Sequence, residues 1–138
     1  MGILMIKISV IYLLIGMVLG MYMSIAFDFA MSSVHSHVSL LGWTTMTLAG
    51  ILYNTFPVMM QSVLCKIQFY LFNIGLPIML ISMALIVVGT DGMVPVVSTG
   101  ASLVSLGILL FTINVFTSLK NDRINPIFVG KTAFHSIP

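Results

Sequence analysis

Charged residues are scarce in this sequence: Asp, Glu, Lys and Arg make up only 6% of its 138 residues, whereas 59% are hydrophobic. A soluble domain contains about 25% charged residues, so this composition excludes one. Cys65 is the only cysteine, which excludes an intramolecular disulfide and a metal site built from cysteines. The five basic residues are scattered and leave a net charge of only +2, so we expect no nucleic-acid partner.

Long apolar stretches take the place of the missing charges. A bilayer core about 30 Å thick requires roughly 20 apolar residues for each helical crossing. Stretches of this length without an internal charge occupy residues 8–27, 33–56, 67–89 and 94–118. They show no two-residue alternation of polarity, which favours helices over barrel strands. We therefore predict an all-α integral membrane protein, with a four-helix up-down bundle in residues 1–119 and a cytoplasmic tail in residues 120–138.

The few charges divide between the two ends of the predicted helices. Asp28 and Asp91 lie in the first and third connections, whereas the basic residues lie near the opposite helix ends. Those basic residues are Lys7, Lys66, Lys120, Arg123 and Lys131. Because cytoplasmic ends of membrane helices carry an excess of Lys and Arg, both termini are predicted to be cytoplasmic.

Proline and glycine indicate helix ends and close contacts. Pro57 is expected to stop the second helix and Pro77 to kink the third, either as a tolerated kink or to widen a cavity. Gly16 and Gly20 have the GxxxG spacing that permits close helix approach, which favours tight packing or self-association.

One place in the predicted spans concentrates polar residues, namely Ser32–Ser39 at the outer end of the second helix. It contains His35 and His37, and neutral imidazole binds iron, copper and zinc. Residues two apart on an α-helix differ by about 200° around its axis, so the two side chains project from nearly opposite faces and cannot share one iron. The spacing therefore favours two separate pockets. Histidines that only form hydrogen bonds near the membrane interface are the alternative.

The third histidine, His135, lies in the predicted tail, about a bilayer's width from His35 and His37. It cannot complete either site. If each iron has two histidine ligands, the second must come from another copy of the chain, which predicts a homo-oligomer. A methionine or water ligand is the alternative.

Two segments of the second span resemble the tenth helix of the catalytic subunit of haem-copper oxidases, with cbb3-type oxidases and nitric oxide reductases as the nearest look-alikes. They are HSHVSLLGW from His35 to Trp43 and GILYNTFP from Gly50 to Pro57. In that family the first histidine of H-x-H ligates the high-spin haem and the second ligates the low-spin haem, which implies these roles for His35 and His37. The topology also resembles that of the family's ninth to twelfth helices, which begin inside and carry H-x-H near the outer face.

The resemblance implies a protein of the prokaryotic cytoplasmic membrane that binds haem b. The family's copper site needs three further histidines on other helices, and the other spans here contain none, so we expect no copper-dependent oxygen reductase. A C-x-x-C-H motif is absent, which excludes covalent c-type attachment. Oxidase catalytic subunits have twelve helices in three groups of four. A homotrimer of this chain would rebuild that ring, with His35 of one protomer beside His37 of its neighbour.

Function depends on how the iron is ligated. Two histidines per haem favour electron transfer, whereas an open position permits oxygen or nitric oxide handling. A quinol or a reduced cytochrome would then be the redox partner. Whether the chain is itself an enzyme stays open. The other interpretations are a haem carrier or sensor, and an accessory subunit of a larger oxidase-like complex.

Overall fold

A computed structural model describes residues 1–121, and within them every regular element is helical. The elements are α1 (Gly2–Ala26), α2 (Ser32–His37), the π-helix η1 (Val38–Thr45), α3 (Met46–Thr55), α4 (Pro57–Gln61), α5 (Val63–Val87) and α6 (Val94–Asn121). Most of the predicted tail, with Arg123, Lys131 and His135, lies outside the described residues. The all-α prediction is confirmed for residues 1–121.

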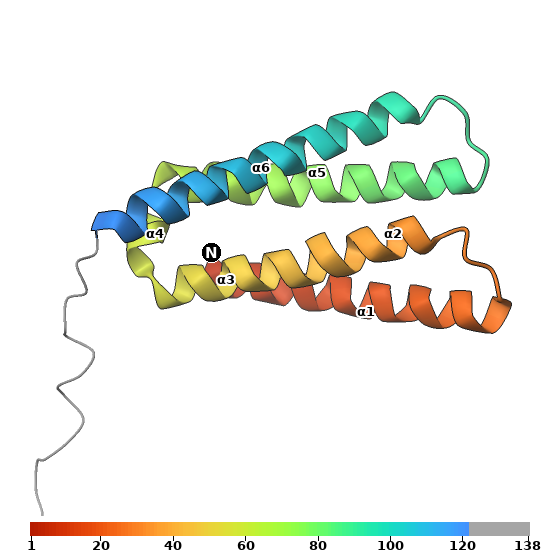
Figure 1. Ribbon diagram of the computed structural model, residues 1–138, viewed down its shortest axis with the longest axis horizontal. Helices are drawn as coiled ribbons and strands as arrows, with labels where there is room; N and C mark the ends of the chain where they lie inside the picture. Colours follow the sequence, from red (N-terminus) through yellow and green to blue (C-terminus); the bar gives the residue numbers. More distant parts are fainter. Residues whose placement is uncertain (122–138) are drawn as a thin grey trace, which may run out of the picture.

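The helices form two antiparallel hairpins that lie side by side (Figure 1). In the first hairpin, α1 packs against the continuous helical path of α2, η1 and α3, and the junction residues Val38 and Met46 keep right-handed helical backbone angles. In the second, α5 packs along α6. The short helix α4 connects the hairpins at the end of the bundle where the N terminus lies, and it also contacts α6.

Three helices are long and apolar enough to cross a membrane: Gly2–Ala26, Val63–Val87 and Val94–Leu119. Their outer faces expose large apolar side chains, for example Met17 at 60% and Ile81 at 62%. Continuous apolar surface of this extent is unfavourable in water, so these faces are suited to contact with lipid. The helices therefore indicate a multi-pass membrane protein. The second expected span, residues 33–56, is instead divided among α2, η1 and α3.

The helix ends differ from the expected ones in ways that local chemistry explains. α1 begins at Gly2 and not at residue 8, so Lys7 lies within it. The second connection is itself helical, because Pro57 stands at the first position of α4, where a proline is well tolerated. Ser62 then starts α5, since its Oγ accepts a hydrogen bond from the backbone N–H of Leu64 at 3.2 Å, and Lys66 falls inside that helix.

Glycines let the paired helices approach closely. A Cβ on Gly16 would lie 3.0 Å from Ser39 Oγ, and one on Gly20 would lie 3.0 Å from His35 Cε1. The GxxxG motif therefore packs α1 against α2 and η1 inside the chain. In the second hairpin, a Cβ on Gly100 would lie 2.6 Å from the backbone nitrogen of Met79.

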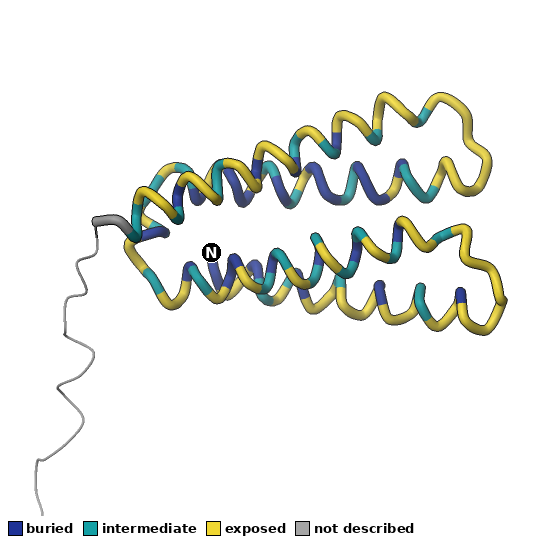
Figure 2. The backbone as a smooth tube through the Cα atoms, in the orientation of Figure 1, coloured by how far each residue is buried: buried dark blue, intermediate teal, exposed yellow. Residues whose placement is uncertain are grey.

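Buried residues gather on the sides of the helices that face one another, most densely along α5, whereas the outer surfaces and the loops opposite α4 are exposed (Figure 2). A polar link joins the hairpins near α4. The buried Tyr53 hydroxyl of α3 donates to Gln68 Oε1 of α5 at 2.7 Å, and its ring meets Phe111 of α6 edge-on at 5.8 Å. Asn114 donates to the Met59 carbonyl at 3.1 Å. This end of the bundle is thus held together by satisfied buried polar groups.

Candidate functional site

The histidine pair lies on α2, the first segment of the second helical path. The N–H of His35 donates to the Met31 carbonyl at 2.9 Å, so the helix is already formed where the pair begins. Val34 and Val38, one turn apart, face α5 and are buried, while His35 and His37 flank them and are half-buried. The helical spacing sends the two imidazoles to different sides of α2.

His35 is held against the first helix. Its Nδ1 lies 2.9 Å from the Gly16 carbonyl oxygen of α1. The ring occupies the notch between Gly16 and Gly20, because a Cβ on Gly20 would come within 3.0 Å of Cε1 and 3.7 Å of Nε2. Glycine at this position therefore makes the room in which the imidazole lies.

His37 is held by its own helix. Its Nδ1 lies 2.8 Å from the Ser33 carbonyl oxygen, one turn earlier. Between the two histidines, the Ser36 hydroxyl donates to the Ser32 carbonyl at 2.9 Å. This hydroxyl is therefore bonded to the backbone of its own helix and forms no hydrogen bond with either imidazole. Backbone carbonyls, and not the neighbouring serine hydroxyls, are therefore the hydrogen-bond partners of the two rings.

These two contacts assign the tautomers. A carbonyl oxygen only accepts hydrogen bonds, so Nδ1 must donate in both rings. In the neutral form each ring then carries its lone pair on Nε2. An Nδ1–H held by a carbonyl is the arrangement that orients histidine for ligating a metal through Nε2. Among residues 1–121, however, no group of three or more His, Cys, Asp or Glu side chains is placed to hold a metal ion.

The π-helix η1 begins immediately after His37. Two side-chain hydrogen bonds also reach back five residues, as its wider turns require. Thr44 Oγ1 donates to the Ser39 carbonyl at 3.1 Å, and Thr45 Oγ1 donates to the Leu40 carbonyl at 2.8 Å. Short π segments occur frequently at functional sites. Sequence reasoning predicted an unbroken α-helix here, because nothing in the apolar pattern distinguishes the two helix types.

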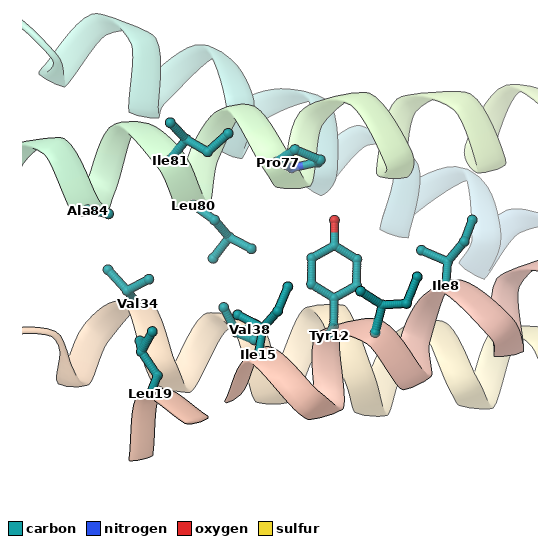
Figure 3. A pocket seen from close by; sticks show the side chains of 11 residues that line it. Ile8, Tyr12, Ile15, Leu19, Val34, Val38, Pro77, Leu80, Ile81 and Ala84 are labelled. Atoms are coloured by element: carbon teal, nitrogen blue, oxygen red, sulfur yellow. The ribbon is translucent and has the colours of Figure 1, made fainter. Parts of the chain in front are cut away.

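A cavity of about 440 Å³ lies between the hairpins, beside the histidine helix (Figure 3). Aliphatic side chains line most of it, and α1, α2, η1 and α5 contribute to it. Its lining residues are Ile8, Ile11, Tyr12, Ile15, Leu19, Val34, Val38, Pro77, Leu80, Ile81 and Ala84. Neither histidine lines it. Pro77 lies inside α5 and forms part of the wall. From the sequence, either a tolerated kink or a widened cavity was expected at this proline.

No protein-family model, curated protein or solved structure matches the chain. Asp28 accepts a hydrogen bond from the backbone N–H of Ala30 at 3.0 Å in an exposed loop. His135 lies outside the described residues.

Proposed function

We propose that the chain is a haem b-binding membrane protein in which His35 and His37 supply axial ligands on different sides of one helix. The observation that supports this most directly is the pair of Nδ1–carbonyl contacts, 2.9 Å for His35 and 2.8 Å for His37. They fix both rings and leave both Nε2 atoms free to ligate.

The surroundings of the pair suit a flat apolar cofactor. Both histidines are half-buried, so part of each side chain lies at the protomer surface. Apolar side chains flank them, among them Val34, Val38 and the exposed Leu40. His35 and His37 would hold haem there, and the group would supply one-electron chemistry while the protein residues orient the ligands and exclude water. Gly20 keeps the space beside His35 open.

Ligand counting favours an assembly of several copies. Each histidine offers one nitrogen, so an iron with two histidine ligands needs the second from another copy of the chain. A homotrimer brings His35 of one protomer beside His37 of the next. In this proposal α2, η1 and α3 together form a fourth crossing, both termini are cytoplasmic and the membrane is the prokaryotic cytoplasmic membrane. Electrons come from a quinol or a reduced cytochrome, and an open iron position would serve oxygen or nitric oxide.

The test is the reduced-minus-oxidised absorption spectrum of the full chain, purified in detergent after expression with ample haem, for wild type, His35→Ala and His37→Ala. We expect sharp b-type bands in wild type and loss of bands in either variant. Ser36→Ala is the matched control, because Ser36 lies between the histidines and bonds only to its own helix. It should keep the wild-type spectrum.

Carbon monoxide added to the reduced protein distinguishes electron transfer from gas binding. An unchanged spectrum supports two histidines per iron and electron transfer, whereas a shift supports an open position and gas binding. A wild-type protein that binds no haem, or bands that persist in both histidine variants, would refute the proposal. The first result would leave the accessory-subunit interpretation standing.

A further inference from the structure

The cavity between the hairpins contains one polar side chain. Tyr12 lines it from α1, and its hydroxyl points toward α5, whereas the other side chains in the wall are aliphatic (Figure 3). Among residues 1–121 this hydroxyl forms no hydrogen bond. A phenol donor without a partner in an apolar site is unfavourable, because it has lost water and gained nothing in exchange. The cavity therefore suits a ligand that carries an acceptor.

Close packing fixes the position of this hydroxyl. The Tyr12 ring lies on Gly42 of η1, where a Cβ would come within 2.6 Å of its Cγ. The tyrosine side chain therefore packs against Gly42 and lines the cavity. A ring held in this way presents its donor at a fixed place, as a binding site requires.

The opposite wall is apolar. Pro77, Leu80, Ile81 and Ala84 of α5 line it, and none of these side chains carries a hydrogen-bonding group. A ligand in the cavity therefore meets one polar side chain, Tyr12, and apolar side chains elsewhere.

We propose that this cavity binds the ring of a membrane-dissolved quinone or quinol. A carbonyl oxygen of the quinone, or a hydroxyl oxygen of the quinol, accepts from the Tyr12 hydroxyl. The volume of about 440 Å³ is within the range of small-molecule sites, roughly 300–1,000 Å³. The rim residues Ile11 and Ile81 are 58% and 62% exposed, so the ring enters from the lipid. An acyl chain has no oxygen at this depth and would leave the hydroxyl unpaired. Binding of the ring does not depend on haem.

The test compares two ligands of the same ring size: menadione, which carries two carbonyls, and 2-methylnaphthalene, which carries none. Affinities are measured on the full chain in detergent micelles by titration of the methyl NMR signals of Leu80 and Ile81, which line the cavity. We expect menadione to bind roughly two- to tenfold more tightly, the effect of one hydrogen bond. Tyr12→Phe should abolish this preference and leave the affinity for 2-methylnaphthalene unchanged.

Two further variants make the result specific. Tyr22→Phe removes a hydroxyl from the same helix, at a residue that is 56% exposed and outside the cavity, and it should keep the preference. Ala84→Trp fills the cavity and should weaken both ligands. Equal affinities in wild type, a preference that survives Tyr12→Phe, or a preference lost in Tyr22→Phe would overturn the proposal. Equal affinities of menadione and 2-methylnaphthalene would indicate a cavity that binds lipid acyl chains. The haem spectrum is a separate measurement, so the two proposals fail independently.

Discussion

Replacement of Gly100 by alanine should separate the two helices of the second hairpin. A Cβ there would lie 2.6 Å from the backbone nitrogen of Met79, 2.9 Å from its Cα and 2.9 Å from the Gly75 carbonyl oxygen. All three atoms belong to backbone, so no side-chain rotation relieves the contact. Overpacking of this kind costs typically 1–3 kcal/mol, against about 0.5–1 kcal/mol gained by removing glycine from a helix. We therefore expect the free energy of unfolding to fall by roughly 1–2 kcal/mol.

Gly107 provides the matched control on the same helix. A Cβ there would lie 3.5 Å from Phe72 Cδ2 and 3.7 Å from the Gln68 carbonyl oxygen, which are ordinary contact distances. Gly107→Ala should leave stability unchanged or raise it by up to about 1 kcal/mol. Both variants are compared with wild type by SDS titration in mixed micelles, with helix content followed by circular dichroism. If Gly100→Ala unfolds at the wild-type SDS fraction, or if Gly107→Ala loses as much stability, the close approach of α5 and α6 at Gly100 is wrong.

Three other predictions concern single contacts. Gly20→Ala should displace the His35 ring, since its Cβ would lie 3.0 Å from Cε1, and should weaken the b-type absorption bands. Gly107→Ala, whose Cβ meets only ordinary contact distances, should keep them. Tyr53→Phe should destabilise the bundle by about 1–3 kcal/mol in SDS titration, because Gln68 loses its buried donor; an unchanged midpoint would contradict this role. Ser62→Ala should cost about 1 kcal/mol in the same assay through loss of the helix cap, whereas Ser62→Asp should retain the wild-type midpoint.

Much of the helical architecture is predictable from the sequence, because a long apolar run in lipid has few alternatives to a helix. The runs that became α1, α5 and α6 were identified, and Pro57 and Pro77 fall where the pattern put them, at the start of α4 and inside α5. Helix ends were less predictable. Lys7 and Lys66 lie inside helices and not before them, since a long side chain at the end of a helix can reach the interface without ending the helix.

The candidate site was predictable in identity but not in detail. Polar residues in an apolar span single out His35 and His37, yet haem ligation stays a prediction. Their hydrogen-bond partners, the carbonyls of Gly16 and Ser33, could not be foreseen, because a backbone acceptor leaves no signal in the residue pattern. Tyr12 was missed for a related reason. Its role depends on how one hairpin lies against the other, which the pattern of a single helix does not contain.

The π-helix η1 makes the second helical path tolerant of a change in length. A π segment holds its hydrogen bonds over one residue more than an α-helix, so deletion of one residue within Val38–Thr45 can be absorbed as ordinary α-helix. The wider turn takes up the missing residue, so the segments before and after it keep their orientation. Such a deletion would therefore leave the imidazoles and the Tyr53 hydroxyl on the sides of the bundle where they now lie.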